Sequence, residues 1–189
     1  MIYGMNNIFF TADLHLGHQN ILRMYPDRPF SQDCNINLHD EYIIAQWNTL
    51  AGKYDDIYIL GDLSLHNAEK TRKILERLNG RKYLCPGNHD SALKNLQNYF
   101  VKVEQIMSVR IKKTRCHGLE TDLEIVLCHY PLLEWDGMNR GAYHLHGHCH
   151  GNLATHNTRR MDVGIDATKQ ILTPLTDIVH YWNRGEGEP

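Results

Sequence analysis

The sequence of 189 residues lacks several features that define large classes of protein. No apolar run approaches the roughly 20 residues that cross a membrane as a helix. The first ten residues lack the basic flank and small-residue cleavage site of a secretory signal. Basic residues are not in excess, since 20 lysines and arginines stand against 22 acidic residues. These absences predict a cytoplasmic protein without a membrane partner, which does not hold a long nucleic acid mainly through phosphate charge.

Cysteine is sparse and follows no metal-binding pattern. The five cysteines are an odd number, and no two are spaced as in a Cys-x-x-Cys motif. They are predicted to be buried thiols rather than a disulfide framework. Histidine, in contrast, occurs 13 times, and it is the commonest metal ligand. The positions of the histidines therefore matter most for function.

The remaining composition is that of a globular protein. Hydrophobic residues make up 42% of the chain and charged residues 22%, which fits neither a disordered chain nor a fibrous repeat. At about 150 residues per domain, the length predicts a single domain over residues 1–183. Residues 184–189 contain two glycines, two glutamates and a proline, and they are predicted to form a disordered tail.

Short apolar runs alternate with helical patterns along the chain. Five strand-like runs lie at 8–12, 57–60, 82–85, 125–128 and 142–146. Apolar residues at three- and four-residue spacing predict helices over 40–50 and 67–78, and a terminal helix is predicted over 174–182. One or two further strands are predicted over 101–113. The order strand, helix, strand, helix, strand indicates an α/β fold.

Each of the five apolar runs is followed by Asp, Asn or His. The polar residues at these ends are Asp13, His15, Asp62, Asn88, His129, His148 and His150. A single ending of this kind would mean little, because turns favour Asp and Asn, but turn chemistry does not account for the histidines. Ligands of α/β sheets bind outside the carboxyl ends of the strands. We therefore expect these side chains to converge on one site.

The residue types and their spacing point to metal binding. Asp13 and His15 are separated by one residue, as are His148 and His150, so in extended backbone each pair projects to the same side. Seven donors exceed the three or four protein ligands of one catalytic zinc ion. They suit two divalent cations about 3.5–4 Å apart. Imidazole combined with carboxylate favours manganese, iron, zinc or nickel over calcium.

The blocks that carry these residues resemble those of a known family. Asp13-x-His15, Gly61-Asp62, Gly87-Asn88-His89-Asp90, His129 and Gly147-His148-x-His150 are similar, in content and order, to the five signature blocks of the calcineurin-like metallophosphoesterases. They extend over most of the chain, and segment 11–21 resembles the small bacterial and phage members. The resemblance implies a four-layer αββα sandwich of two mixed sheets flanked by helices. A dinuclear metal site would lie at the carboxyl ends of the strands.

The resemblance also implies a role for each residue. One metal would be held by Asp13, His15, Asp62 and His150, and the other by Asp62, Asn88, His129 and His148, with Asp62 as the bridge. His89 resembles the family's catalytic histidine, which acts on the substrate without binding metal, and Asp90 is expected to orient it. The implied reaction is hydrolysis of a phosphate ester, with a phosphodiester favoured over a monoester. A hydroxide that bridges the two ions would attack phosphorus directly.

Two other functions stay open. A nuclease of the same superfamily would act on DNA or RNA ends, but the near-neutral charge and the lack of an aromatic and basic groove do not favour it. A non-enzymatic metal-binding scaffold of the same fold would be expected to lack ligands, and none is missing. The identity of the phosphate-ester substrate and the oligomeric state are not indicated by the sequence.

Several other polar residues could lie near such a site. Those that could bind phosphate oxygens, although each also suits a surface or loop position, are Arg28, Tyr130, Arg140 and Asn157. His18 follows the first block closely and could contact a substrate, and His66 is a weaker candidate for the mouth of the site. His144 and His146 continue the alternation before Gly147, but they are expected to face the core.

Overall fold

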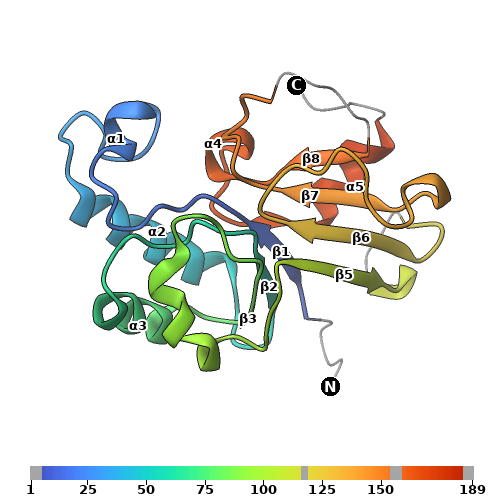
Figure 1. Ribbon diagram of the computed structural model, residues 1–189, viewed down its shortest axis with the longest axis horizontal. Helices are drawn as coiled ribbons and strands as arrows, with labels where there is room; N and C mark the ends of the chain where they lie inside the picture. Colours follow the sequence, from blue (N-terminus) through green and yellow to red (C-terminus); the bar gives the residue numbers. More distant parts are fainter. Residues whose placement is uncertain (1–5, 116–118, 154–158, 185–189) are drawn as a thin grey trace.

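Two mixed β-sheets form the centre of the protein (Figure 1). The computed structural model describes residues 6–115, 119–153 and 159–184. The strand order is β4-β3-β2-β1-β9 in the first sheet and β5-β6-β7-β8 in the second. With helices flanking the sheets, this arrangement confirms the predicted fold class.

The first sheet is parallel except at one edge. Its parallel strands are β1 (Ile8–Thr11), β2 (Asp56–Ile59), β3 (Arg81–Leu84) and β4 (Lys102–Val103). The short β9 (Thr173–Pro174) pairs antiparallel with β1. Three of the predicted runs are therefore the three central strands of this sheet, and their carboxyl ends point to the same edge.

The second sheet carries the other two predicted runs. β6 (Leu123–Cys128) and β7 (Tyr143–His146) are parallel neighbours, with the antiparallel β5 (Ile106–Ile111) on one side and the parallel β8 (Arg160–Asp162) on the other. The apolar pattern did not predict β8, because its three residues include a single hydrophobic side chain, Met161.

The helices begin where side chains satisfy their first backbone N–H groups. α2 (Ile36–Leu50) starts four residues earlier than predicted, since Asn35 Oδ1 accepts the N–H of Leu38 at 3.1 Å. Asn67 caps α3 (Ala68–Arg77) in the same way. α5 (Leu175–Asn183) matches the predicted terminal helix. The short helical segments are α1 (Ile21–Met24), η1 (Asp90–Asn95), η2 (Gln97–Tyr99), η3 (Lys113–Arg115), η4 (Met138–Arg140) and α4 (Ile165–Thr168).

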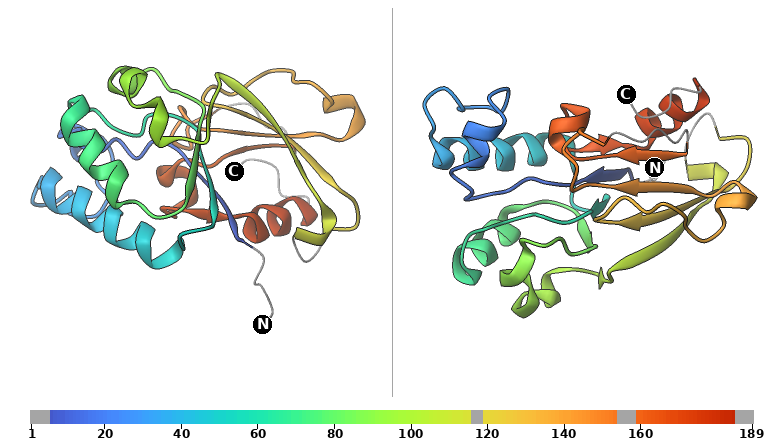
Figure 2. Two further views of the ribbon diagram at one scale, coloured as in Figure 1. Left: turned by 90° about the horizontal axis from the view of Figure 1, so that it is seen from below. Right: turned by 45° about the horizontal axis from the view of Figure 1, so that its top comes forward.

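Alternate residues of the strands build two apolar layers. Phe9 of β1 belongs to the cluster beneath α2 and α3, which cover the outer face of the first sheet (Figure 2). Phe10, the next residue, is fully buried on the opposite side, in the cluster that includes residues of both sheets and α5. Its ring stacks on Tyr58 with centroids 5.3 Å apart. The outer face of the second sheet is covered by the segment 130–142, through Trp135 and Ala142.

The loops that follow the strands are joined to one another by backbone hydrogen bonds. The N–H of Asp13 donates to Gly61 O at 3.0 Å, and that of Gly147 donates to His129 O at 3.0 Å. The N–H of His148 donates to the Asp13 carboxylate at 2.9 Å, which links the two sheets. The predicted ligands are therefore held at one edge of the sandwich.

None of the helices in the described ranges has the length and apolar character needed to span a membrane. Residues 185–189 of the predicted tail lie outside the described residues.

The layer between the sheets should dominate stability. We expect Phe10→Ala to lower the free energy of unfolding by about 3–5 kcal/mol, because it leaves a cavity between packed side chains. Urea denaturation followed by circular dichroism measures the change. Tyr54→Ala is the matched control, since Tyr54 is 64% exposed, and it should change stability by no more than about 0.5 kcal/mol. Equal losses in the two variants would contradict this assignment of the core.

Candidate metal centre

Two groups of side chains at this edge have donor atoms close enough to share metal ions. In one group, the donor atoms of Asp13, His15 and His150 lie within 4.8 Å of one another; in the other, those of Asp13, Asp62 and His129 do. These residues come from the loops after β1, β2, β6 and β7, so that both sheets contribute.

Asp62, a member of the second group, also faces a histidine of the first group. Its Oδ2 is 3.6 Å from His15 Nε2 on one side and 3.6 Å from His129 Nε2 on the other. Its Oδ1 accepts the backbone N–H of His89 at 2.9 Å. One carboxylate oxygen is thus placed to face two sites at once, as a bridging ligand must.

Asn88 and His148 complete the set on the exposed side. Asn88 Oδ1 lies 3.1 Å from His129 Nε2, and the His148 ring lies edge-on to the His129 ring, with centroids 5.0 Å apart. His148 approaches the centre through this ring contact and through its N–H on Asp13. Five of the seven predicted ligands thus have donor atoms close to one another, and Asn88 and His148 lie beside one of them, His129.

The backbone at these positions is unusual. Five of the predicted ligands have a positive φ, namely Asp13 (58°), His15 (50°), Asp62 (52°), His148 (69°) and His150 (51°). Non-glycine residues rarely adopt this left-handed region, and each such residue costs about 1–3 kcal/mol. Strain of this kind persists where surrounding contacts enforce it, and it is concentrated at functional sites.

Three histidines of the centre have Nδ1 in contact with another polar group. Nδ1 of His129 donates to Leu60 O at 2.8 Å, and Nδ1 of His150 donates to Asp166 at 2.6 Å. Nδ1 of His15 lies 3.3 Å from Nδ1 of His18. In His129 and His150 the acceptor on Nδ1 fixes the tautomer and leaves Nε2 as an acceptor for a metal. In His129, Nε2 is then an acceptor, and it faces Asn88 Oδ1, which is also an acceptor. Two acceptors do not form a hydrogen bond, so a cation bound by both atoms suits this geometry better.

The burial of the donor atoms indicates whether these residues are suited to binding divalent cations. The His15 Nε2 atom is buried and has no hydrogen-bond partner. Asp13 is fully buried, and Asp62 is nearly so. Burial, reinforced by the charges of Asp162 and Asp62, raises the pKa of Asp13 well above its usual value. Neighbouring buried carboxylates and an unpartnered imidazole nitrogen need a positive charge between them, so the donor set fits metal binding.

Two glycines leave room for the central carboxylate. A Cβ atom on Gly147 would lie 2.7 Å from Asp13 Oδ2, and one on Gly164 would lie 2.6 Å from it. Real Cβ atoms do not approach oxygen so closely, so that any larger residue would displace Asp13. Gly147 belongs to the block Gly147-His148-x-His150, whereas Gly164 lies outside all five blocks.

Asp166 and Arg28 support the centre from behind. Asp166 accepts from His150 and from Nε of Arg28 at 2.9 Å. Burial alone would raise the pKa of Asp166, but the hydrogen bonds from His150 and Arg28 outweigh it and lower the pKa to about 2. Arg28 also donates to Leu14 O at 3.0 Å and to Asp13 O at 2.7 Å. Its guanidinium is thus buried and bonded to the loop after β1 and to Asp166.

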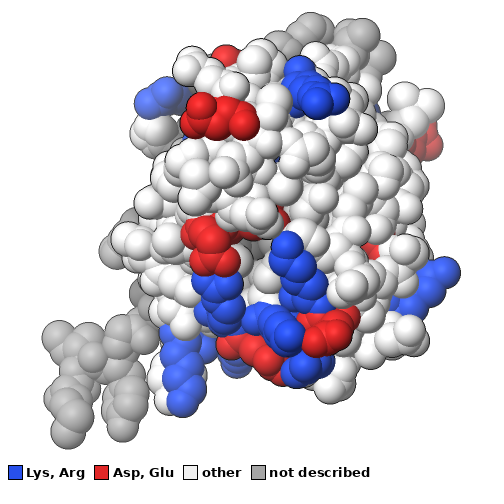
Figure 3. Space-filling view, turned by 90° about the vertical axis from the view of Figure 1, so that its left-hand side faces the viewer, with Lys and Arg blue, Asp and Glu red and all other residues white. Residues whose placement is uncertain are grey.

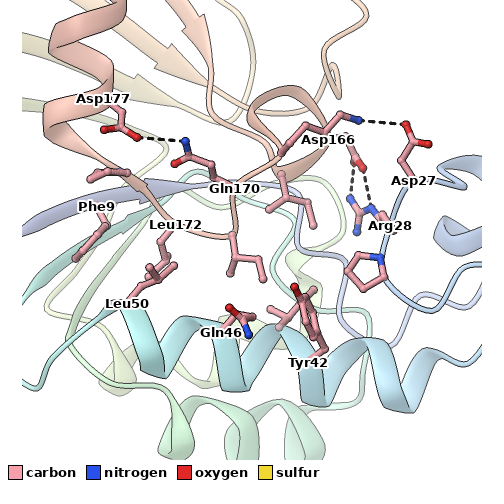
Figure 4. Close-up of a pocket in the computed structure, with 16 residues that line it drawn as sticks. Phe9, Asp27, Arg28, Tyr42, Gln46, Leu50, Asp166, Gln170, Leu172 and Asp177 are labelled. Carbon is pink, nitrogen blue, oxygen red and sulfur yellow. Dashed lines mark hydrogen bonds and ion pairs between the residues drawn. The ribbon is translucent and has the colours of Figure 1, made fainter.

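Figure 4 shows this ion pair in the wall of a separate cavity. The cavity, of about 510 Å³, lies between α2 and residues 165–174, and none of the seven predicted ligands lines it. Asp166 was not predicted as a site residue. It lies in the first turn of a four-residue helix and follows no apolar run, so no local pattern marks it.

His89 and Asp90 occupy different environments. His89 is exposed, and its Nε2 lies 4.0 Å from Asp62 Oδ2. Asp90 is buried, and its carboxylate accepts the backbone N–H groups of Gly87 (2.8 Å), Asp62 (2.8 Å) and Leu63 (2.9 Å). Both oxygens of Asp90 thus hold the two loops together, which differs from the expected role of orienting His89.

The other polar residues that the sequence suggested near the site lie in different environments. Tyr130 is 42% exposed, and its ring lies edge-on to His129 and His148. Arg140 is exposed and pairs with Asp136 at 3.1 Å. Asn157 lies outside the described residues. As expected, His144 and His146 are fully buried, and their Nδ1 atoms donate to backbone carbonyls.

The contact between Asp166 and His150 generates a testable expectation. Asp166→Asn should weaken metal affinity by about 10- to 100-fold, because the imidazole loses the carboxylate that orients it. Calorimetric titration of the metal-free protein with Mn²⁺ measures the change, and thermal unfolding without metal checks that the variant folds. Asp177→Asn, which alters an exposed carboxylate on α5, should bind Mn²⁺ like the wild type. An unchanged affinity in Asp166→Asn would show that His150 needs no orienting partner.

Comparison with known proteins agrees with this arrangement. Residues 7–152 match the family model described as calcineurin-like phosphoesterase. The Gene 66 protein of Mycobacterium phage L5 is 28% identical, with 97% of this chain and 99% of the phage protein aligned. The Gene 66 protein of Mycobacterium phage D29 is 29% identical over 92% and 94% of the two chains. An uncharacterised protein of Methanocaldococcus jannaschii is 39% identical over 46% of this chain and 48% of its own length.

A solved structure shares the fold. The protein of unknown function AQ665 from Aquifex aeolicus superposes with a TM-score of 0.67 over 92% of this chain and 97% of its own, at 21% identity. Family membership implies hydrolysis of a phosphate ester with bound metal. The family model covers well over half of the 189 residues, and the chain belongs to the calcineurin-like phosphoesterase family.

Proposed function

We propose that the protein is a dinuclear metal-dependent phosphoesterase that hydrolyses a phosphodiester by direct attack of water. The observation that carries the proposal is the position of Asp62, whose Oδ2 lies 3.6 Å from a histidine Nε2 of each donor group. A single-metal site would not need a carboxylate between two sets of imidazoles.

The chain offers a complete donor set for each ion. One ion would be held by Asp13, His15, Asp62 and His150, and the other by Asp62, Asn88, His129 and His148. When bound, two divalent cations neutralise the charge of the phosphate and lower the pKa of the attacking water. The mixed nitrogen and oxygen donors suit manganese, iron, zinc or nickel.

His89 is proposed as the acid that protonates the leaving oxygen. Its side chain is exposed, so that a substrate can reach it, and its Nε2 lies 4.0 Å from Asp62 Oδ2. The N–H of His89 is bonded to Asp62, which keeps the residue beside the centre. General acid catalysis of this kind contributes about 10²- to 10⁴-fold. Asp90 is a positioning residue, since it bonds the loops that carry Asp62 and His89.

A diester is favoured because neither of the two candidate arginines is available to neutralise the additional negative charge of a monoester. Arg28 is buried and fully bonded, and Arg140 is exposed and paired with Asp136. A monoester carries more negative charge than a diester, and neither arginine is free to neutralise the difference. A cytoplasmic location is proposed as well, because the thiols of Cys34, Cys85 and Cys128 form no disulfide among the described residues, as is usual in a reducing compartment.

The surface gives little support to a nuclease. On the face shown in Figure 3, basic and acidic side chains are interleaved. Basic residues of α3 are neutralised by acids, as in the pairs of Lys73 with Glu69, Arg72 with Glu76 and Arg77 with Glu41. Such a face offers no continuous basic track for a phosphate backbone.

A substrate panel with a stereochemical readout tests the proposal. The protein loaded with Mn²⁺ is expected to hydrolyse chromogenic phosphodiesters faster than the matched monoesters, and faster than it degrades single-stranded DNA. A phosphorothioate diester of defined chirality, hydrolysed in ¹⁸O-labelled water so that the product is chiral at phosphorus, should react with inversion, since one in-line attack occurs. Retention would reveal a covalent phosphoenzyme, and inactivity with every diester at saturating metal would contradict the phosphodiesterase proposal.

Two variants separate metal binding from acid catalysis. Asp62→Asn should lose both metal and activity, because the shared carboxylate charge disappears. His89→Gln should keep its metals and lose about 10²- to 10⁴-fold in kcat. Metal content by elemental analysis and kcat by steady-state kinetics give the two readouts. If His89→Gln emptied the site, the division between ligands and acid would be wrong.

A further inference from the structure

A small polar cavity adjoins the proposed acid and has no role in the scheme above. It measures about 270 Å³, and its lining includes His66, Asn88, His89 and Ser91. Among the described residues that line it, none is Lys, Arg, Asp or Glu. The cavity therefore offers hydrogen-bonding groups without a fixed formal charge, directly beside the centre.

A buried carboxylate holds His66 in place. Asp40 of α2 is 4% exposed, and its Oδ2 lies 2.7 Å from Nε2 of His66. Its other oxygen, Oδ1, accepts the backbone N–H of Gly17 at 3.2 Å and lies 3.3 Å from Nδ1 of His39. A carboxylate on a distant helix thus fixes the His66 ring relative to the loop that carries His15.

The ring of His66 is also fixed from the side of Gly17. Gly17 has a φ of 81°, and a Cβ at this position would overlap the His66 ring. The side chain of His66 keeps 13% exposure. With Nε2 bonded to Asp40, Nδ1 has no hydrogen bond among the contacts of the described residues, and it lies in the part of the ring that packs against Gly17. An imidazole locked in this way can offer one nitrogen to a ligand at little entropic cost.

We propose that this cavity binds the leaving alcohol of the phosphodiester, and that His66 selects an alcohol that carries additional hydroxyl groups. The inference rests on the proposed function. His89 lines the same cavity, so the alcohol that it protonates extends toward His66. In the step, the P–O bond to the alcohol breaks, a P–O bond to the water oxygen forms, and the alcohol leaves with a proton from His89. A neutral polar lining suits a polyol better than an apolar or charged group.

Two diesters that differ only in hydroxyl groups test the proposal. Methyl 2,3-dihydroxypropyl phosphate and methyl propyl phosphate both yield methyl phosphate when the larger alcohol leaves, and ³¹P NMR distinguishes this product from release of methanol. The Mn²⁺-loaded wild type should prefer the dihydroxypropyl ester in kcat/KM by roughly 2- to 10-fold, the value of about one hydrogen bond.

The variants assign this preference to one side chain. His66→Phe keeps the ring volume against Gly17 and should bring the ratio of the two kcat/KM values close to one. His66→Gln, which retains a hydrogen-bonding group, should keep part of the preference. His180→Phe alters an exposed histidine on α5 and should keep the wild-type ratio. Thermal unfolding confirms that each variant folds.

The outcomes separate this inference from the proposed function. Hydrolysis without any preference in the wild type, or a preference that survives in His66→Phe, overturns the role of His66 and leaves the phosphoesterase intact. If neither of these two diesters is hydrolysed, the proposed function fails only when the chromogenic diesters are not hydrolysed either. Calorimetry then decides the inference alone: glycerol 3-phosphate should bind more tightly than propyl phosphate, and equal affinities would overturn it.

Discussion

Buried negative charge at the junction of two sheets is the constraint on which the rest of this structure depends. Asp13 and Asp62 are withdrawn from water, and burial raises the pKa of Asp13 well above its usual value. Such groups persist in a folded protein when cations or hydrogen bonds compensate them. Backbone N–H groups of His89 and His148 supply part of that compensation, and the buried, unbonded Nε2 of His15 beside Asp62 points to metal ions for the remainder.

Two charged residues outside the set of predicted metal ligands, Asp90 and Arg28, stabilise the strained loops of the centre. Asp90 accepts three backbone N–H groups from the loops after β2 and β3. Arg28 donates to two backbone carbonyls of the loop after β1 and to Asp166. Both side chains are buried, and both form hydrogen bonds with backbone groups of the loops that carry the predicted ligands. The left-handed conformations at Asp13, His15 and Asp62 are therefore maintained by side chains from other parts of the chain.

The substrate side is built differently from the metal side. His89, Asn88 and Tyr130 are exposed, whereas the groups behind the centre are buried. The cavity beside His89 extends the centre toward His66, which Asp40 orients. The predicted metal ligands thus lie at the ends of strands, whereas the side chains that we propose to select the alcohol lie at the rim.

The sequence by itself determined the five strands β1, β2, β3, β6 and β7 and the identity of the residues that follow them. Continuous apolar runs such as 57–60 mark a buried strand locally, and motifs such as Asp13-x-His15 keep both ligands within three residues. It did not determine where α2 begins, which depends on the Asn35 cap, or that β8 exists, since a three-residue strand has too few apolar positions. Only the tertiary structure decided the partners. Arg28 meets Asp166 across 138 positions of sequence, and Asp40 meets His66 across 26. Hydrogen bonds between residues so far apart leave no period in the sequence, because they depend on how the sheets and helices pack.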